Sequence, residues 1–346
     1  MNMMQLAQAL IEKIARDYKD DISLVHLHGS YAYGAEHDQS DLDIYFVPKT
    51  QRGYELGYTF IVDGIGCDLW ALSWERLERI AAHEERTATI ITEGKVLWYS
   101  SDEDLKRFER LQALARDTSD RSAWLARANK ILEGIYKDAF FMQNSDDISQ
   151  VRSDAIGLVY TISFALAQLN GNPIRRGRKL LKEEILAMPL VPDDFAPLYD
   201  ALFYEAAIDE IKKAAVKLVQ NTEKLVSGEL SKTSIKRGFA DVFRGWYEEM
   251  IQSYNKIYHA HAIGDVYTPL FAAVEYSYEL GEMLKQVGIE PNLPDMVAAY
   301  DSGDLSKIEK AAHAHQQAFE ALLKENGIAP LRFSTMEEAV EYLNGR

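Results

Sequence analysis

The sequence contains a single cysteine, Cys67, and comparatively few basic residues. One thiol can form neither an intrachain disulfide nor a cysteine-based zinc site. The 346 residues include 38 Lys and Arg against 54 Asp and Glu, which gives a formal net charge of −16. Because a DNA- or RNA-binding surface neutralises phosphates with clustered Lys and Arg, this composition argues against nucleic acid as the main partner. A neutral or cationic small molecule suits the charge better.

Long apolar runs are also missing. No stretch of about 18 apolar residues occurs, so we expect no membrane span. Residues 1–13 are amphipathic and lack the basic and apolar regions of a signal peptide, from which we expect a cytoplasmic protein. Hydrophobic residues nevertheless make up 47% of the chain, which excludes a disordered or low-complexity protein. The length predicts two or three domains.

The first part of the sequence predicts a small mixed β-sheet with flanking helices. A four-residue apolar spacing predicts a helix over residues 6–14, and another helix is expected over 74–83. Asp63-Gly64 favours a type I′ turn and therefore a hairpin. Strands are predicted for residues 23–28, 42–47, 59–62, 65–72 and 94–99.

The rest of the sequence has a helical pattern, so we predict an α+β fold: a sheet domain followed by an all-α region. The expected domains are residues 1–116, 117–230 and 231–346. A last helix is expected from the capping-box spacing of Ser334 to Glu337. The other helices are predicted at residues 122–143, 149–170, 176–188, 208–227, 234–263, 268–287 and 306–326.

Two acidic residues, Asp41 and Asp43, stand two positions apart on a predicted strand. Their carboxylates should therefore point to one face of the sheet. Two neighbouring carboxylates resist joint ionisation unless a cation lies between them. Mg²⁺ prefers such oxygen ligands together with nucleotide phosphates. The spacing therefore predicts a magnesium site.

Two further features accompany this pair. Gly29-Ser30 ends the preceding predicted strand, where backbone N–H groups and a hydroxyl can meet a phosphate and where glycine permits close approach of a ligand. Asp68 lies in the second strand of the predicted hairpin, beside the strand that carries Asp41 and Asp43. Three carboxylates on neighbouring strands match a two-metal arrangement for displacement at phosphorus.

The combination of Gly29-Ser30, Asp41-x-Asp43 and Asp68 resembles the DNA polymerase β-like nucleotidyltransferase superfamily over about residues 20–100. Within it, the chain looks most like the kanamycin type of aminoglycoside nucleotidyltransferase. The resemblance implies that Asp41, Asp43 and Asp68 hold Mg²⁺, with two ions expected. It also implies that Gly29 and Ser30 contact the triphosphate of ATP or another NTP, with Ser40 beside the acids as a further contact.

The narrower resemblance implies a Glu that acts as general base and a Lys near the phosphates, both on a later helix. Glu133 and Lys137 have the family's spacing, and i, i+4 residues share a helix face. The same pair is equally typical of a solvent-exposed helix, so both interpretations stay open. Lys179 could reach the triphosphate, although its basic run is also typical of a solvated helix start. An Asp in place of Glu at position 68, and about 100 additional residues, depart from the family pattern.

The activity implied is Mg²⁺-dependent transfer of a nucleoside monophosphate, with AMP from ATP favoured, to a hydroxyl, releasing pyrophosphate. Asp68 and Glu133 are the candidate bases. The expected acceptor is a small hydroxylated and cationic molecule, with an aminoglycoside antibiotic favoured and a lincosamide as an alternative. A homodimer is compatible with the family. The other interpretations are transfer to a protein or to tRNA, and a non-catalytic nucleotide-binding regulator on the same fold.

Overall fold

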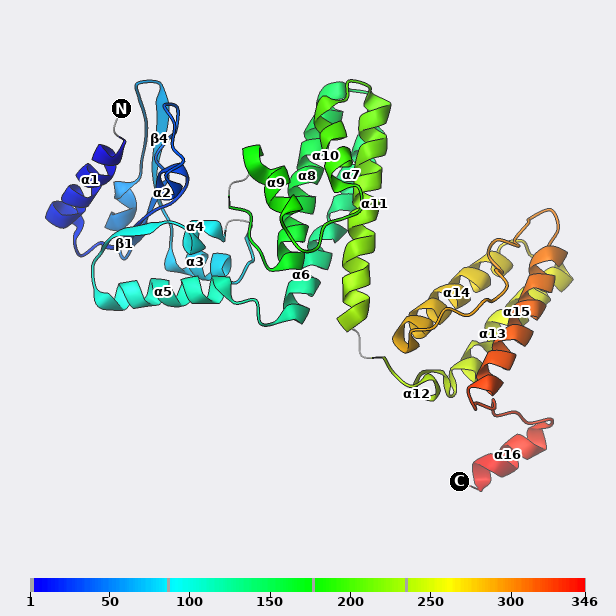
Figure 1. Cartoon of the computed structure of the whole chain (residues 1–346). Helices are drawn as coiled ribbons and strands as arrows, with labels where there is room; N and C mark the ends of the chain where they lie inside the picture. The colour runs from blue at the N-terminus through cyan, green and yellow to red at the C-terminus, as the bar shows by residue number, and fades with distance from the viewer. Residues whose placement is uncertain (1–2, 86–87, 176–177, 234–235, 346) are drawn as a thin grey trace. The chain divides into compact units, whose positions relative to one another are not determined.

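The computed structural model describes residues 3–85, 88–175, 178–233 and 236–345. The chain divides into two compact units, Met1–Lys232 and Thr233–Arg346. The first unit contains the β-sheet and a helical part, and the second contains only helices among its described residues (Figure 1). The predicted α+β fold class is confirmed. Within the described residues, none of the helices combines the length and apolarity needed to cross a lipid bilayer.

Five strands form one mixed sheet in the order β3-β4-β2-β1-β5. β2 and β4 run parallel, and the other neighbouring pairs are antiparallel. The predicted hairpin is present, because Asp63 and Gly64 between β3 and β4 both have positive φ, 50° and 81°. The strands are β1 (Ile22–Leu27), β2 (Ile44–Pro48), β3 (Tyr58–Val62), β4 (Ile65–Ala71) and β5 (Lys95–Tyr99).

Side chains alternate between the two faces of this sheet, and each face has its own core. Val25, Ile44 and Cys67 pack on one side together with residues of α1 (Met4–Lys13). Leu24 and Tyr45 pack on the other side, with α3 (Trp74–Ala81) and α5 (Asp102–Arg116). The sheet therefore has helices on both faces (Figure 1).

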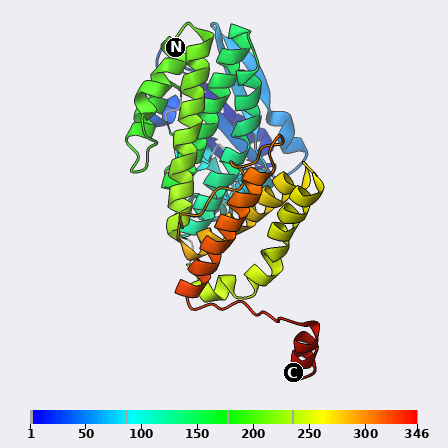
Figure 2. The same cartoon turned by 90° about the vertical axis from the view of Figure 1, so that its right-hand side faces the viewer.

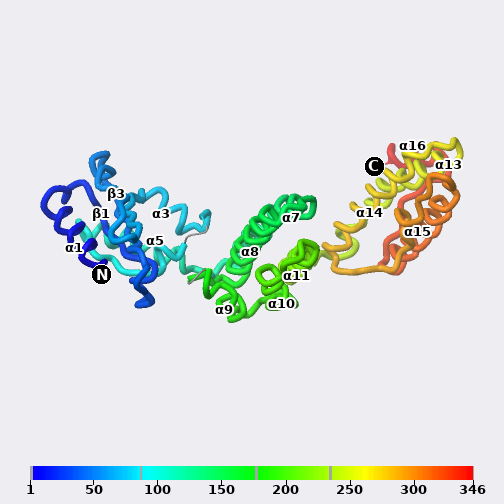
Figure 3. Tube along the Cα trace, turned by 90° about the horizontal axis from the view of Figure 1, so that it is seen from above, coloured from blue at the N-terminus to red at the C-terminus, as the bar shows by residue number. Residues whose placement is uncertain are grey.

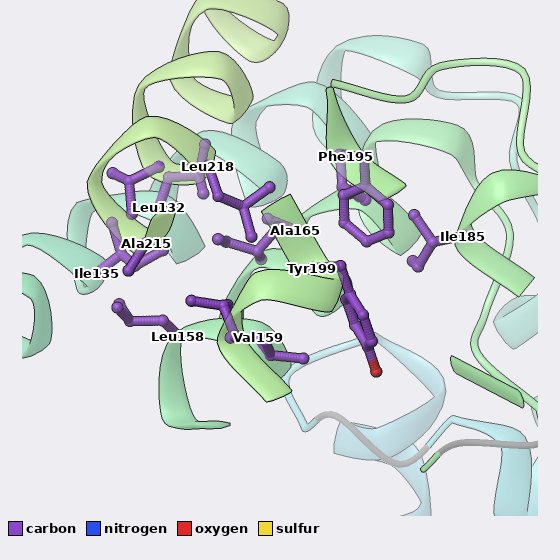
Figure 4. Close-up of a cluster of buried hydrophobic side chains, with 14 of the residues drawn as sticks. Leu132, Ile135, Leu158, Val159, Ala165, Ile185, Phe195, Tyr199, Ala215 and Leu218 are labelled. Atoms are coloured by element: carbon purple, nitrogen blue, oxygen red, sulfur yellow. The ribbon is translucent and has the colours of Figure 1, made fainter. Parts of the chain in front are cut away.

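The helical part of the first unit forms a third core. α8 (Ile148–Asn170) packs along α7 (Ile135–Gln143), which is labelled beside it in Figure 3. It also packs along α6 (Arg121–Glu133). Leu158, Val159 and Ala165 of α8 meet side chains of α10 (Phe195–Tyr204) and α11 (Ile208–Thr233) in this core (Figure 4). α9 (Leu181–Leu186) adds Leu181 and Ile185.

Several helices differ from the predictions in their bounds. The helix expected over 122–143 is divided at Gly134 into α6 and α7. The helix expected over 176–188 is replaced by a 3₁₀ turn, Arg178–Leu180, and α9; residues 176–177 lie outside the described part. α11 continues through Gly228 to Thr233.

Two of the longer helices, α5 with 15 residues and α10 with 10 residues, were not predicted. α5 begins where the Ser101 side chain accepts a hydrogen bond from the Asp104 N–H, and its first turn contains three acids, which favour a helix start. α10 is short and strongly apolar, with Pro197 in its first turn, where proline removes no helical hydrogen bond. Apolar residues around a short helix give no clear period, so its pattern was not recognised.

In the second unit, α13 (Trp246–Ile263) lies against both α14 (Thr268–Val287) and α15 (Ser306–Glu325) (Figure 2). A short helix, α12 (Phe239–Phe243), precedes Gly245, whose φ of 83° divides the predicted helix over 234–263; residues 234–235 lie outside the described part. The last helix, α16 (Met336–Asn344), is present, but its cap lies one residue later than predicted: Thr335 accepts from the Glu338 N–H at 3.2 Å.

Candidate functional site

The candidate site lies where β1 ends beside the start of β2. The His28 N–H donates to the Asp43 carbonyl oxygen at 2.9 Å, so the pairing of β1 and β2 continues one residue beyond the strands themselves. Gly29 then turns the chain with φ 71° and ψ −157°, and Ser30 begins α2 (Ser30–Tyr33). This register brings the Gly-Ser turn and Asp43 together.

Gly29 and the Asp43 carboxylate are in direct contact. A Cβ atom built on Gly29 would lie 1.8 Å from Asp43 Oδ2. The Asp43 carboxylate occupies the space where a side chain at position 29 would lie, and the contact of Gly29 with a triphosphate stays a prediction. The absence of a side chain at position 29 therefore fixes where this carboxylate can lie.

Asp41 and Asp43 directly precede β2, which begins at Ile44, so the expectation that both lie within the strand is wrong by a few residues. The predicted alternation is nevertheless visible, because Leu42 joins the core that contains Ile44. Asp41 is exposed and Asp43 half-buried. Burial, together with the charge of Asp41, raises the pKa of Asp43 to about 6.

Asp68 lies on the neighbouring strand, as expected. Ile44 of β2 pairs with Leu69 of β4, so Asp68 is level with Asp43 across the parallel pair. Asp68 is exposed, and its Oδ1 accepts a hydrogen bond from Thr59 Oγ1 at 3.1 Å. The part of the chain that the structure describes contains no group of three or more His, Cys, Asp or Glu placed to hold a metal ion. Coordination by Asp68 therefore stays a prediction.

Two buried polar atoms at the end of β1 have no hydrogen-bond partner among the described residues: Ser30 Oγ and His28 Nε2. Burial lowers the pKa of His28 to about 4, so its ring is neutral at pH 7. This ring packs near Tyr45 and Trp70, at centroid distances of 5.7 and 6.4 Å. Because buried polar groups are nearly always paired, the Ser30 hydroxyl is suited to a ligand. Sequence analysis did not identify His28 as a site residue.

Ser40 is buried and closes the turn that leads to the acids. Its hydroxyl oxygen accepts from the His37 N–H at 2.9 Å, and its own N–H donates to the His37 carbonyl at 2.9 Å. This contact gives Ser40 a role in positioning the loop. Its contact with a nucleotide stays a prediction.

A cavity of about 380 Å³ opens beside α2, within the first unit. Tyr33 of α2 lines it together with Glu93, Asn172, Arg175 and Glu184. The Arg175 Nε lies 3.3 Å from Glu93 Oε1. The backbone N–H of Arg175 donates to Glu184 Oε2 at 2.7 Å. The sequence does not indicate Glu93, Asn172 and Glu184 as site residues.

Glu93 is held at the same end of the sheet as Asp43. Leu27 of β1 pairs with Ile44 on one side and with Lys95 of β5 on the other. Gly94, between Glu93 and Lys95, packs so closely on β1 that an added Cβ would lie 2.1 Å from the Leu27 carbonyl oxygen. One lining residue of the cavity, Glu93, therefore lies at the end of the sheet where Asp43 is found.

The remaining predicted residues are exposed and lie outside the set that lines this cavity in the described structure. Glu133 ends α6 and accepts from Asn129 Nδ2 at 3.4 Å, whereas Lys137 belongs to α7, with its Nζ 6.0 Å from the Phe141 ring centroid. The premise that both lie on one continuous helix is wrong, because Gly134 divides it. Lys179 lies in the 3₁₀ turn. The catalytic or nucleotide-binding roles of these residues stay predictions.

Comparison with solved structures shows distant similarity. The chain is similar to the crystal structure of a nucleotidyltransferase-like protein from Exiguobacterium sibiricum 255-15, with 11% sequence identity and a TM-score of 0.36. The match covers 66% of this chain and 76% of that chain. No family model and no curated protein matches the sequence. A similarity this distant defines neither activity nor substrate, and the resemblance to the kanamycin type stays a prediction.

Proposed function

We propose that the protein is an Mg²⁺-dependent nucleotidyltransferase that moves a nucleoside monophosphate, AMP from ATP, to a hydroxyl of a small molecule. The observation that carries this proposal is the half-buried Asp43 carboxylate beside Asp41, next to the Gly29-Ser30 turn. A carboxylate in this environment is costly to ionise, as the raised pKa of Asp43 indicates. A divalent cation removes that cost.

The residues present fit such a cation. The Asp41 and Asp43 carboxylates are hard oxygen ligands, which Mg²⁺ prefers, and they would hold it while phosphate oxygens complete the coordination. When bound, the cation would neutralise phosphate charge that develops during displacement. The unpaired Ser30 hydroxyl can donate a hydrogen bond to a phosphate oxygen.

In the proposed reaction, the acceptor hydroxyl oxygen forms a bond to the α-phosphorus of ATP. The bond from that phosphorus to the bridging oxygen breaks, and pyrophosphate leaves with the electron pair. The hydroxyl proton passes to a carboxylate, for which we propose Asp68, because it is exposed and level with Asp43. Glu133 is the second candidate. The protein contributes mainly by positioning the reactants and neutralising charge.

For the acceptor, we propose a small hydroxylated molecule that carries amines, such as an aminoglycoside. The cavity of about 380 Å³ has a size typical of small-molecule sites. Among the described residues that line it, two carboxylates, Glu93 and Glu184, stand beside one guanidinium, Arg175, and the whole chain carries −16. Both features favour a cationic acceptor over a polynucleotide.

Pyrophosphate release from ATP tests this proposal, measured with and without Mg²⁺ across aminoglycosides, lincosamides, tRNA and protein acceptors. We expect turnover with an aminoglycoside that requires Mg²⁺ and falls at least about 100-fold in Asp43→Asn. Asp63→Asn is the matched control, because it neutralises an exposed aspartate in a turn whose positive φ asparagine tolerates. Turnover only with tRNA or only with a protein would refute the proposal that the acceptor is a small molecule. Tight ATP binding without turnover would favour a regulatory protein, and unchanged turnover in Asp43→Asn would refute the metal site.

A further inference from the structure

Helix α14 is apolar on two opposite faces. One face packs into the core of the second unit through Ala272, Ala273, Tyr276 and Leu280. The opposite face carries four large apolar residues that are strongly exposed, Tyr267 at 76%, Phe271 at 67%, Val274 at 47% and Tyr278 at 67%. We call these four residues the α14 stripe.

The α14 stripe has the spacing of a helix–helix seam. Its members follow one another at intervals of four, three and four residues, which is the a/d spacing of a coiled coil. A surface helix of a globular protein normally has a polar outer face, and a helix that is apolar all round is normally buried. The stripe therefore has the pattern of a helix packed against another helix.

The size of the stripe agrees with a weak, specific interface. With about 200 Å² for each large side chain, the exposed fractions correspond to about 500 Å² of accessible surface. Two copies of the stripe would then bury about 1,000 Å², which reaches the lower limit of specific protein–protein interfaces. A single stripe already matches the largest apolar patches found on typical monomers.

We propose that the α14 stripe is the contact between two copies of this chain, packed antiparallel about a two-fold axis. In this register Phe271 of each copy meets Val274 of the other, and Tyr267 meets Tyr278. Such a two-fold contact is self-complementary, since the same residues serve on both sides. The tyrosine rings bury apolar surface while their hydroxyls stay at the wet ends of the seam.

Sedimentation velocity over a concentration series tests the proposal on the full chain. We expect the wild-type protein to dimerise in the micromolar range and Phe271→Asp to remain monomeric with an unchanged circular dichroism spectrum. Met336→Asp is the matched control: it also places a carboxylate at a strongly exposed apolar residue, 74% exposed, but on α16, and should dimerise like the wild type. A wild-type monomer at every concentration, or an unchanged dimer in Phe271→Asp, would overturn the proposal.

Cysteine cross-linking tests the register. Cys67 is only 2% exposed, so new surface thiols react selectively. We expect a mixture of Tyr267→Cys and Tyr278→Cys chains to form a disulfide-linked heterodimer on mild oxidation, with little linkage in either variant alone. Linkage within each variant alone would show a parallel pairing instead, and the absence of any linkage in the mixture would contradict the contact.

Discussion

At the scale of single residues, Asp43 is the group whose environment matters most. Its carboxylate is half-buried, lies against Gly29 and faces the charge of Asp41. Its pKa rises from 3.8 to about 6 on folding, so the folded state holds a proton that the unfolded state has lost between these values. The free energy of unfolding therefore falls as the pH rises from about 4 to about 6, and this loss of stability is complete above pH 6.

Asp43→Asn should consequently stabilise the protein without Mg²⁺ at pH 7 and above. We expect a gain of about 1–2 kcal/mol in the free energy of unfolding, after allowing for the partial exposure of the carboxylate. The gain should vanish near pH 4. Urea denaturation at pH 4, 6 and 8 measures it, and added Mg²⁺ should stabilise the wild type more than the variant. A variant less stable than the wild type at pH 8 would contradict this account.

A substitution at Gly29 tests its contact with the Asp43 carboxylate directly. Gly29→Ala puts a Cβ onto the carboxylate and into a backbone conformation that essentially only glycine adopts, so we expect a loss of about 3 kcal/mol and loss of Mg²⁺-dependent nucleotide binding. Gly34→Ala is the control, because Gly34 also has positive φ, 64°, but an added Cβ meets nothing within 4 Å. Gly34→Ala should lower the free energy of unfolding by about 1 kcal/mol, and the variant should bind nucleotide as the wild type does. Equal losses in both variants would show that only backbone conformation matters.

The residue types of the site were predictable, but their contacts were not. Asp41-x-Asp43 and Gly29-Ser30 are adjacent to recognisable strands, which is why the sequence indicates them. The contact of Asp43 with Gly29 depends on the register of β1 against β2, which local pattern does not determine. Glu93 and Glu184 come from separate segments that only tertiary structure brings to one cavity.

At the scale of elements, β1 is held between β2 and β5, and Gly94 permits the close approach of β5. Gly94→Ala would place a Cβ 2.1 Å from the Leu27 carbonyl oxygen, at a φ of 103°. We expect a loss of about 3 kcal/mol or more in the free energy of unfolding, together with weaker binding of the acceptor that we propose for the cavity beside Glu93.

Gly66→Ala in β4 is the control for that change. An added Cβ at Gly66 meets nothing within 4 Å, and its φ is not in the left-handed region. Alanine should therefore change stability by less than about 1 kcal/mol, in the stabilising direction. Thermal unfolding of both variants compares them, and a comparable loss in Gly66→Ala would refute the importance of the contact between Gly94 and β1.

Elements with a strong local signal were predicted correctly. The five strands follow alternating or apolar runs, and Asp63-Gly64 determines the hairpin because both residues tolerate positive φ. The helix over residues 122–143 was predicted as continuous because glycine inside a helical pattern is often tolerated, whereas here Gly134 ends α6. Helix α10 was missed because a short apolar segment does not distinguish helix from strand.

At the scale of the whole molecule, the chain contains two compact units with separate cores. Leu166 is completely buried in the helical core of the first unit, and Phe319 is completely buried in the second. We expect calorimetry to resolve two transitions. Leu166→Ala should lower the first unit's stability and Phe319→Ala the second unit's, each by about 3 kcal/mol, with little effect on the other transition. A single transition shifted equally by both changes would contradict this division.

Asp41 and Asp43 are proposed to hold a divalent cation against the phosphates of a nucleotide at the Gly29-Ser30 turn. A crystal structure with Mn²⁺ and a non-hydrolysable ATP analogue tests it most directly, because Mn²⁺ is located by its anomalous scattering. We predict a peak bridging the two carboxylates and the triphosphate, with a phosphate oxygen hydrogen-bonded to Ser30 Oγ. A nucleotide bound elsewhere, or a cation that contacts neither carboxylate, would contradict the account.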